Sequence, residues 1–130
     1  MSRFTLIAGA ALALASGAAG AADFDGSKKL ICAPVDVHEC VEGSRCRSFT
    51  PRTAGAPEFL RIDVAAKQIS GPKRTTQIAN VVKGDQQVLL TGTELDWGWT
   101  LAIDSTDGAM TLTLADRDGA YVLFGSCTPL

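Results

Sequence analysis

The sequence predicts an all-β fold, a small antiparallel meander that is closed as a barrel or packed as a sandwich. About seven or eight short stretches of alternating apolar and polar residues follow one another at roughly ten-residue spacing, separated by turn residues. No stretch after the N-terminal segment keeps helical periodicity. Four cysteines indicate a disulfide-stapled domain, and a cleaved signal peptide is expected to precede it.

The first 21 residues have the order of a secretory signal peptide. Basic Arg3 precedes an apolar run from Phe4 to Ala15, and small residues ending in Ala19-Gly20-Ala21 follow. An anchoring helix is the alternative, but the run is shorter than the roughly 20 apolar residues of a membrane span. We therefore expect cleavage after Ala21 or the neighbouring Ala22, which leaves residues 22–130 as a single exported β domain.

The expected mature domain is mildly acidic. It keeps 11 of the 12 basic residues and all 14 acidic ones, for a net charge of about −3. Nucleic-acid binding needs a basic footprint, so this charge argues against a nucleic-acid partner. No later stretch of the sequence reaches transmembrane length. We expect a periplasmic or secreted protein with no transmembrane segment in the mature chain.

The cysteines predict two disulfides, because an even number in an oxidising compartment indicates pairing. Sequence alone allows three pairings, and we favour Cys40 with Cys46 and Cys32 with Cys127. Glu42-Gly43-Ser44 is turn chemistry that can bring the first pair together. The second bond would tie the first strand to the last.

Two metal-binding interpretations are weaker. A zinc site would use Cys32, His38, Cys40 and Cys46, but their spacing lacks the short cysteine pairs of structural zinc. The segments 104–108 and 116–119 contain Asp and Gly in a faintly calcium-loop-like order, without the EF-hand register. We read both segments as turns and expect no metal ion and no cofactor.

Residues 22–57 are expected to contain one strand and a long irregular segment. Leu30 to His38 alternates, with one face formed by Ile31, Ala33, Val35 and Val37. Pro34 within it indicates an edge strand or a bulge. Residues 40–57 are either a functional loop or a loop pinned by a disulfide. Within that loop, Thr50 before Pro51 is expected to open one helical turn.

From Phe59 onward the pattern is almost entirely β. Strands are expected in residues 60–64, 68–70, 75–83, 87–91, 95–104, 110–114 and 120–127. Asp118-Gly119 between two alternating runs is a strong hairpin signal. The last strand is nearly all apolar, which indicates a central strand buried on both faces.

Trp97 and Trp99 are candidate binding residues. They alternate on the same predicted face as Leu95, Leu101 and Ile103, so we expect both indoles to lie in the core. The alternative is an aromatic platform for a sugar or an apolar ligand.

Arg45, Arg47 and Arg52 are the second set of candidate binding residues, the one basic concentration in an acidic protein. On a loop stiffened by a disulfide they would face an acidic partner surface or a glycan. The alternative is a solvated loop.

The only histidine, His38, shares a predicted strand face with Asp36. A general base with its orienting carboxylate is one interpretation, and a solvated face is the other. No serine lies in a nucleophile elbow, and phosphate and dinucleotide motifs are absent from the sequence. No catalytic residue is therefore predicted.

Together these observations predict a non-enzymatic binding module that docks an envelope or extracellular protein or glycan through its loops. One alternative is a lipocalin-like carrier whose barrel interior takes a small apolar ligand beside Trp97 and Trp99. The other is an enzyme of unfamiliar type that uses Asp36 and His38.

Overall fold

A computed structural model describes residues 23–130, and the predicted signal peptide of residues 1–21 lies outside them. The described chain contains ten strands and one short helix. The strands are Leu30–Val41 (β1), Arg47–Phe49 (β2), Leu60–Asp63 (β3), Gln68–Ser70 (β4), Thr75–Gln77 (β5), Asn80–Lys83 (β6), Gln87–Glu94 (β7), Trp97–Asp104 (β8), Ala109–Ala115 (β9) and Gly119–Pro129 (β10), and the helix is Pro51–Ala54 (α1). Within residues 23–130, no helix has the length and apolar character that spanning a membrane requires.

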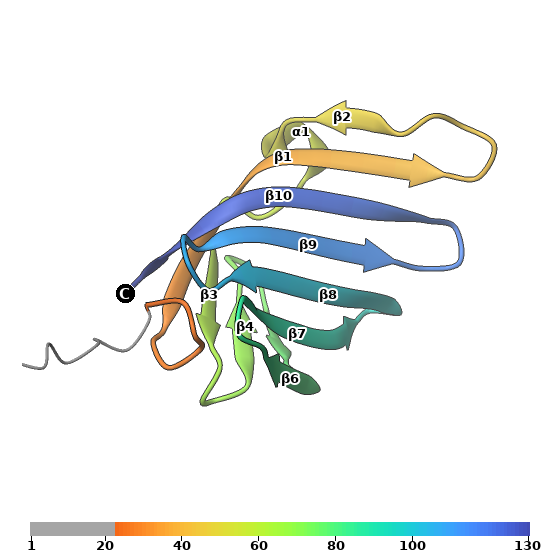
Figure 1. The fold of residues 1–130 in the computed structure, drawn as a ribbon. Coiled ribbons are helices and arrows are strands. Elements are labelled where there is room, and N and C mark those ends of the chain that lie inside the picture. Colours follow the sequence, from red (N-terminus) through yellow and green to blue (C-terminus); the bar gives the residue numbers. More distant parts are fainter. Residues whose placement is uncertain (1–22) are drawn as a thin grey trace, which may run out of the picture.

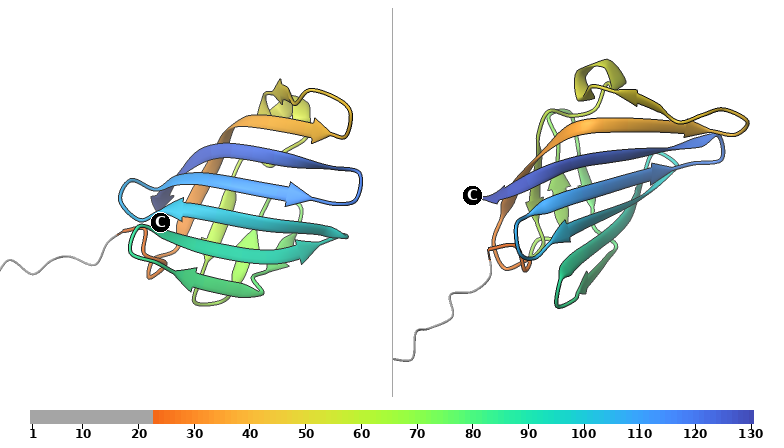
Figure 2. Two further views of the ribbon diagram at one scale, coloured as in Figure 1. Left: turned by 45° about the vertical axis from the view of Figure 1, so that its right-hand side comes forward. Right: turned by 45° about the horizontal axis from the view of Figure 1, so that its top comes forward.

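All ten strands belong to one antiparallel sheet that curls into a half-barrel. Their order is β5-β4-β3-β1-β10-β9-β8-β7-β6, with β2 paired to β1 outside this path. Figure 1 and both views of Figure 2 show β3 and β4 behind the wall made by β1, β10, β9, β8 and β7. Within the described chain β5 and β6 do not pair, so the ladder stays open. The expected meander is therefore a half-barrel and not two packed sheets.

Side-chain contacts link β5 and the turn before it to the C-terminal end of β7, across the open side of the half-barrel. The Thr76 hydroxyl donates a 3.3 Å hydrogen bond to the carbonyl of Thr93. Arg74 Nη1 donates to Glu94 Oε1 at the same distance, 3.3 Å. Side chains thus connect the two sides of the opening, where continuous backbone pairing would close the sheet into a barrel.

A β-bulge in β1 decides which of its residues face the interior. The register with β10 shifts between Pro34 and Asp36, and Val35 between them is 67% exposed. Cys32 before the bulge and Val37 after it are both buried. The predicted face, which grouped Val35 and the odd-numbered residues before it with Val37, is wrong because an extra residue reverses the alternation. The bulge itself was predicted at Pro34, but β1 is not an edge strand, because β10 lies on one side and β2 and β3 on the other.

A row of aliphatic side chains crosses the concave face in register. It consists of Val37, Leu123, Leu112, Leu101 and Leu90, one from each of five adjacent strands. All five are buried. On the side of this row where β1 begins, the interior is filled by the buried side chains of Leu30, Cys32, Ile62, Val88, Ile103 and Met110.

The last strand, β10, is central but is not buried on both faces. Leu123 and Cys127 are buried, whereas Phe124 is 43% exposed. The prediction of two buried faces is wrong because the single sheet packs its core on the concave side, and the convex side of β10 meets solvent.

The structure joins Cys32 to Cys127 and Cys40 to Cys46, which is the pairing expected from the sequence. Cys32 and Cys127 are opposite each other in the β1–β10 register, and both are buried. The Cys40–Cys46 bond spans the turn between β1 and β2. No cysteine in the described part of the chain is free.

Candidate functional site

An apolar pocket of about 450 Å³ opens on the concave face of the half-barrel. Its floor is the aliphatic row, through Val37, Leu101, Leu112 and Leu123. Further walls come from residues 54–57 after α1 and from Leu60 and Ile69. A volume of this size lies within the range of about 300–1,000 Å³ that small-molecule sites occupy, and barrel mouths are a common place for them.

Aromatic side chains form the wall of the pocket beyond the aliphatic row. Tyr121 lies opposite Leu114, which in turn lies opposite Trp99. The rings of Trp97 and Tyr121 are tilted at 52°, with 5.6 Å between their centroids. Trp99 is buried, as expected for a core residue, whereas Trp97 is only half-buried and lines the pocket. Leu95, which was grouped with them, is 70% exposed because the turn before β8 interrupts the alternation.

Gly92 allows the indole of Trp99 to approach β7 closely. The two residues are opposite in the β7–β8 register. A Cβ at Gly92 would lie 2.7 Å from Trp99 Cε2 and 2.7 Å from the carbonyl of Gln77. Gly92 was not predicted as a site residue, although a glycine within a strand often marks a close approach of another group.

Glu39 joins the pocket wall to β2. The Tyr121 hydroxyl donates a 2.7 Å hydrogen bond to Glu39 Oε1, and Arg47 Nη2 donates one of 2.6 Å to Oε2. These bonds, Tyr121 first and Arg47 second, lower the pKa of Glu39. The same bond from its hydroxyl raises the pKa of Tyr121. Neither Glu39 nor Tyr121 was predicted as a site residue, and the only signal for them in the sequence is a single tyrosine, whose hydroxyl needs a hydrogen-bond partner where it is buried.

Two charged side chains lie at the rim. Arg74 belongs to the turn between β4 and β5, where its carbonyl accepts a 2.9 Å hydrogen bond from Gly71 N. Glu94 ends β7, opposite Trp97. Their ion pair, at 3.3 Å, places one positive and one negative group beside an otherwise apolar cavity.

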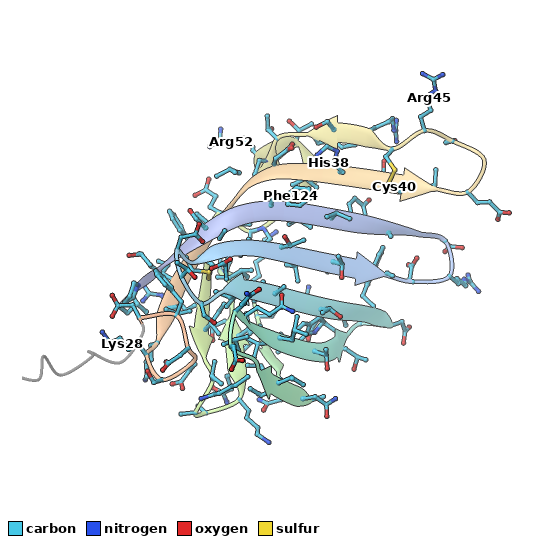
Figure 3. All side chains as sticks on the ribbon, viewed as in Figure 1. Lys28, His38, Cys40, Arg45, Arg52 and Phe124 are labelled. Carbon is cyan, nitrogen blue, oxygen red and sulfur yellow. A yellow bond between two sulfur atoms is a disulfide. The ribbon has the colours of Figure 1, made fainter. Side chains whose placement is uncertain are left out.

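The three arginines singled out in the sequence occupy separate positions. Arg47 pairs with Glu39, and its guanidinium lies 5.3 Å from the centre of the Phe49 ring. Arg52, on α1, is 3.8 Å from a carboxylate oxygen of Glu58. Figure 3 shows Arg45 on the β1–β2 turn, well separated from Arg52. They do not form one continuous basic patch.

Asp36 and His38 share the convex face, as predicted, outside the pocket. His38 Nε2 is 2.8 Å from Asp36 Oδ2, and the Ser48 hydroxyl donates a 3.1 Å bond to Asp36 Oδ1. The bond to His38, followed by that from Ser48, lowers the pKa of Asp36. The His38 ring meets Phe124 edge-on at 5.8 Å (Figure 3). Because Ser48 is bonded to the carboxylate and not to the imidazole, the trio lacks the nucleophile–base contact of covalent catalysis.

The aspartates that begin the two C-terminal turns accept hydrogen bonds from backbone amides of the same turn. Asp104 Oδ1 accepts a 2.7 Å hydrogen bond from Thr106 N, and Asp116 Oδ1 accepts one of 2.8 Å from Asp118 N. These are the turns predicted for the two segments. Residues 23–130 contain no cluster of three or more His, Cys, Asp or Glu side chains that could hold a metal ion.

The strongest candidate site is therefore the concave pocket, which can hold an apolar group against aromatic rings, with a charged pair at its rim. The chain matches no protein family model, no curated protein and no solved structure.

Proposed function

We propose that the protein is an exported, non-enzymatic binding module that holds a small apolar ligand in its concave pocket. The observation that supports this proposal is the apolar cavity of about 450 Å³ beside Trp97, Trp99 and Tyr121. Aromatic and aliphatic walls favour an apolar ligand because its surface leaves water on binding.

Titration with the neutral apolar dye N-phenylnaphthylamine tests this proposal. The dye should bind the oxidised protein, and Ala56→Trp should weaken binding by about tenfold or more because the indole occupies the cavity. Ala115→Trp is the matched control, because Ala115 is exposed on β9 and does not line the pocket. Both variants should keep the wild-type circular dichroism spectrum. A wild-type protein that binds no dye, or a folded Ala56→Trp variant that binds it unchanged, would contradict the proposal.

Export is the second part of the proposal. It is supported by the signal-peptide order of residues 1–21 and by the two disulfides, which form in oxidising compartments. Intact-mass measurement of protein recovered from the producing cell should give a chain that begins at Ala22 or Asp23 and has no free thiol. A mass that retains the first 21 residues would instead indicate an anchored protein.

A second candidate function is docking to an envelope protein or glycan through the β1–β2 hairpin. Residues 41–48 are all exposed, and the Cys40–Cys46 disulfide constrains their turn. A loop held in one conformation loses less entropy on binding. Capture of a partner from envelope extract should then be lost with Arg45→Glu and kept with Arg117→Glu, which changes an exposed arginine on the turn between β9 and β10.

A further inference from the structure

We propose that the ligand of the concave pocket is a single-chain amphiphile with a carboxylate head group. Its alkyl chain lies on the aliphatic floor, and its head group lies against basic side chains at the rim and just outside it. This inference rests on the proposed function, because it names the chemical class that the same pocket takes.

A second hollow, of about 650 Å³, adjoins the pocket. The two cavities share the segment 55–57, Leu60, Ile69 and the rim residues Arg74, Thr76 and Glu94. They therefore form one groove, which is apolar and aromatic at its inner end and more polar at its outer end. A ligand that fills the groove needs an apolar part and a polar part.

The outer end of the groove carries more positive than negative side chains. Its lining includes the basic residues Arg52, Lys73 and Arg74 and the acidic residues Glu58 and Glu94. Arg52 and Arg74 each have an acidic neighbour, at 3.8 and 3.3 Å. In the described part of the chain Lys73 makes no ion pair. In a protein of net charge −2, this local excess favours an anionic head group over a cationic one.

Arg74 has hydrogen-bonding capacity left for such a head group. Its guanidinium offers five N–H donors in a planar fork that fits a carboxylate. Among residues 23–130, its side chain donates one hydrogen bond, from Nη1 to Glu94. The side chain is 52% exposed, so a ligand can reach its other nitrogens. Lys73, the preceding residue on the same turn, adds a second positive charge.

Three twelve-carbon ligands that differ in head group test the inference: dodecanoate, dodecanol and dodecyltrimethylammonium. Dodecanoate and dodecyltrimethylammonium are titrated below their micelle concentrations and dodecanol below its solubility limit, each against N-phenylnaphthylamine bound to the oxidised protein. Dodecanoate should bind about tenfold tighter than the other two, and its advantage should fall as salt rises, because screening weakens exposed charge pairs. Shortening the chain to decanoate should weaken binding roughly fourfold per methylene, equivalent to about 0.8 kcal/mol each.

Variants assign the head-group position. Lys73→Gln should lower the affinity for dodecanoate and leave that for dodecanol unchanged. Arg117→Gln is the matched control, because Arg117 is 91% exposed on the β9–β10 turn and lines neither cavity, and it should change neither. Arg74→Gln should act like Lys73→Gln.

The outcomes separate the two proposals. Equal affinity for dodecanoate and dodecanol, or tighter binding of dodecyltrimethylammonium, would overturn the carboxylate inference and keep the apolar pocket. Binding of none of the three, together with no binding of the dye, would overturn both. Binding to vesicles of anionic phospholipid without binding of free dodecanoate would also overturn the inference, because the basic side chains would then bind a membrane surface and not a free carboxylate.

Discussion

Tyr121 and Glu39 lie directly opposite each other in the β1–β10 ladder, and the tyrosine hydroxyl donates a 2.7 Å hydrogen bond to the carboxylate. This bond joins one wall of the concave pocket to the strand that carries the Cys40–Cys46 hairpin. It also holds the pKa of Glu39 below its ordinary value of 4.5 and the pKa of Tyr121 above its ordinary value of 10.0.

Acid should weaken the fold through Glu39. Because folding lowers the pKa of this carboxyl, its stabilisation is fully present above 4.5 and is lost as the pH falls through the lower folded value. Tyr121→Phe removes the main donor, so the variant should unfold at lower urea than wild type near neutral pH. The difference should shrink below pH 4.5 and reach a smaller, constant value once Glu39 is protonated in both states. A difference that stays constant down to about pH 2 would contradict this linkage.

At high pH, the titration of Tyr121, the only tyrosine in the chain, should depend on the same hydrogen bond. Its pKa is raised mainly by the hydrogen bond to Glu39, so the folded state favours the protonated phenol. Stability from this source is present below the unfolded pKa and is lost as the pH rises through the higher folded value. In an ultraviolet absorbance titration, Glu39→Gln should lower the pKa of Tyr121 toward 10.0, whereas Glu42→Gln on the exposed turn should leave it unchanged.

Much of the fold follows from short-range sequence signals. Turn residues mark the hairpins at 104–108 and 116–119, and Thr50 caps α1 by accepting a 3.2 Å hydrogen bond from Thr53 N. These features depend on neighbouring residues alone. The bulge in β1 shows what short-range signals cannot predict. Pro34 indicates that a bulge is present, but it does not indicate that the buried face of the strand reverses after it. The curl into a half-barrel is likewise a property of the whole sheet.

The candidate site is harder to predict because its members are far apart in the chain. Glu39 and Tyr121 are separated by 82 positions and meet only through the strand register. Trp97 and Trp99 share a strand face but differ in burial, because Trp97 lies at the start of β8, farther from the aliphatic row than Trp99 does, and its half-buried indole lines the pocket. Alternation predicts a side chain's face and not how deeply that face is covered.

The two disulfides should contribute unequally to stability. Cys32–Cys127 closes a separation of 95 residues and Cys40–Cys46 one of only 6. In the chain-entropy account the first stabilises by about 4.7 kcal/mol and the second by about 2.2 kcal/mol. Urea unfolding of Cys32→Ala/Cys127→Ala and of Cys40→Ala/Cys46→Ala should preserve this order. A larger loss from opening the hairpin bond would contradict it.

Gly92→Ala should destabilise the fold through Trp99. The new Cβ would sit 2.7 Å from Trp99 Cε2 and from the carbonyl of Gln77, so the indole or the backbone must move, at a cost of about 1–3 kcal/mol. Gly98→Ala is the control, because a Cβ there meets only the Ala115 carbonyl at 3.8 Å. Thermal melts compare the two variants. Equal melting temperatures would show that the fold tolerates a Cβ at position 92 and that the close approach of Trp99 does not require glycine there.

The two tryptophans should separate stability from binding. Trp99 is 6% exposed and belongs to the core, so Trp99→Ala should cost about 3–5 kcal/mol, a large part of the roughly 5–15 kcal/mol that stabilises a typical domain. Trp97 is half-buried against Tyr121 at the pocket, so Trp97→Ala should melt much closer to wild type and lose most of its affinity for N-phenylnaphthylamine.

Fluorescence of the Phe variants checks the assignment. Trp97→Phe leaves Trp99, whose emission should be blue-shifted and resist iodide, while Trp99→Phe leaves Trp97, whose emission should be quenched by iodide and protected when ligand is bound. Equal destabilisation by the two alanine variants, with unchanged dye binding by Trp97→Ala, would place Trp97 in the core and remove it from the binding wall.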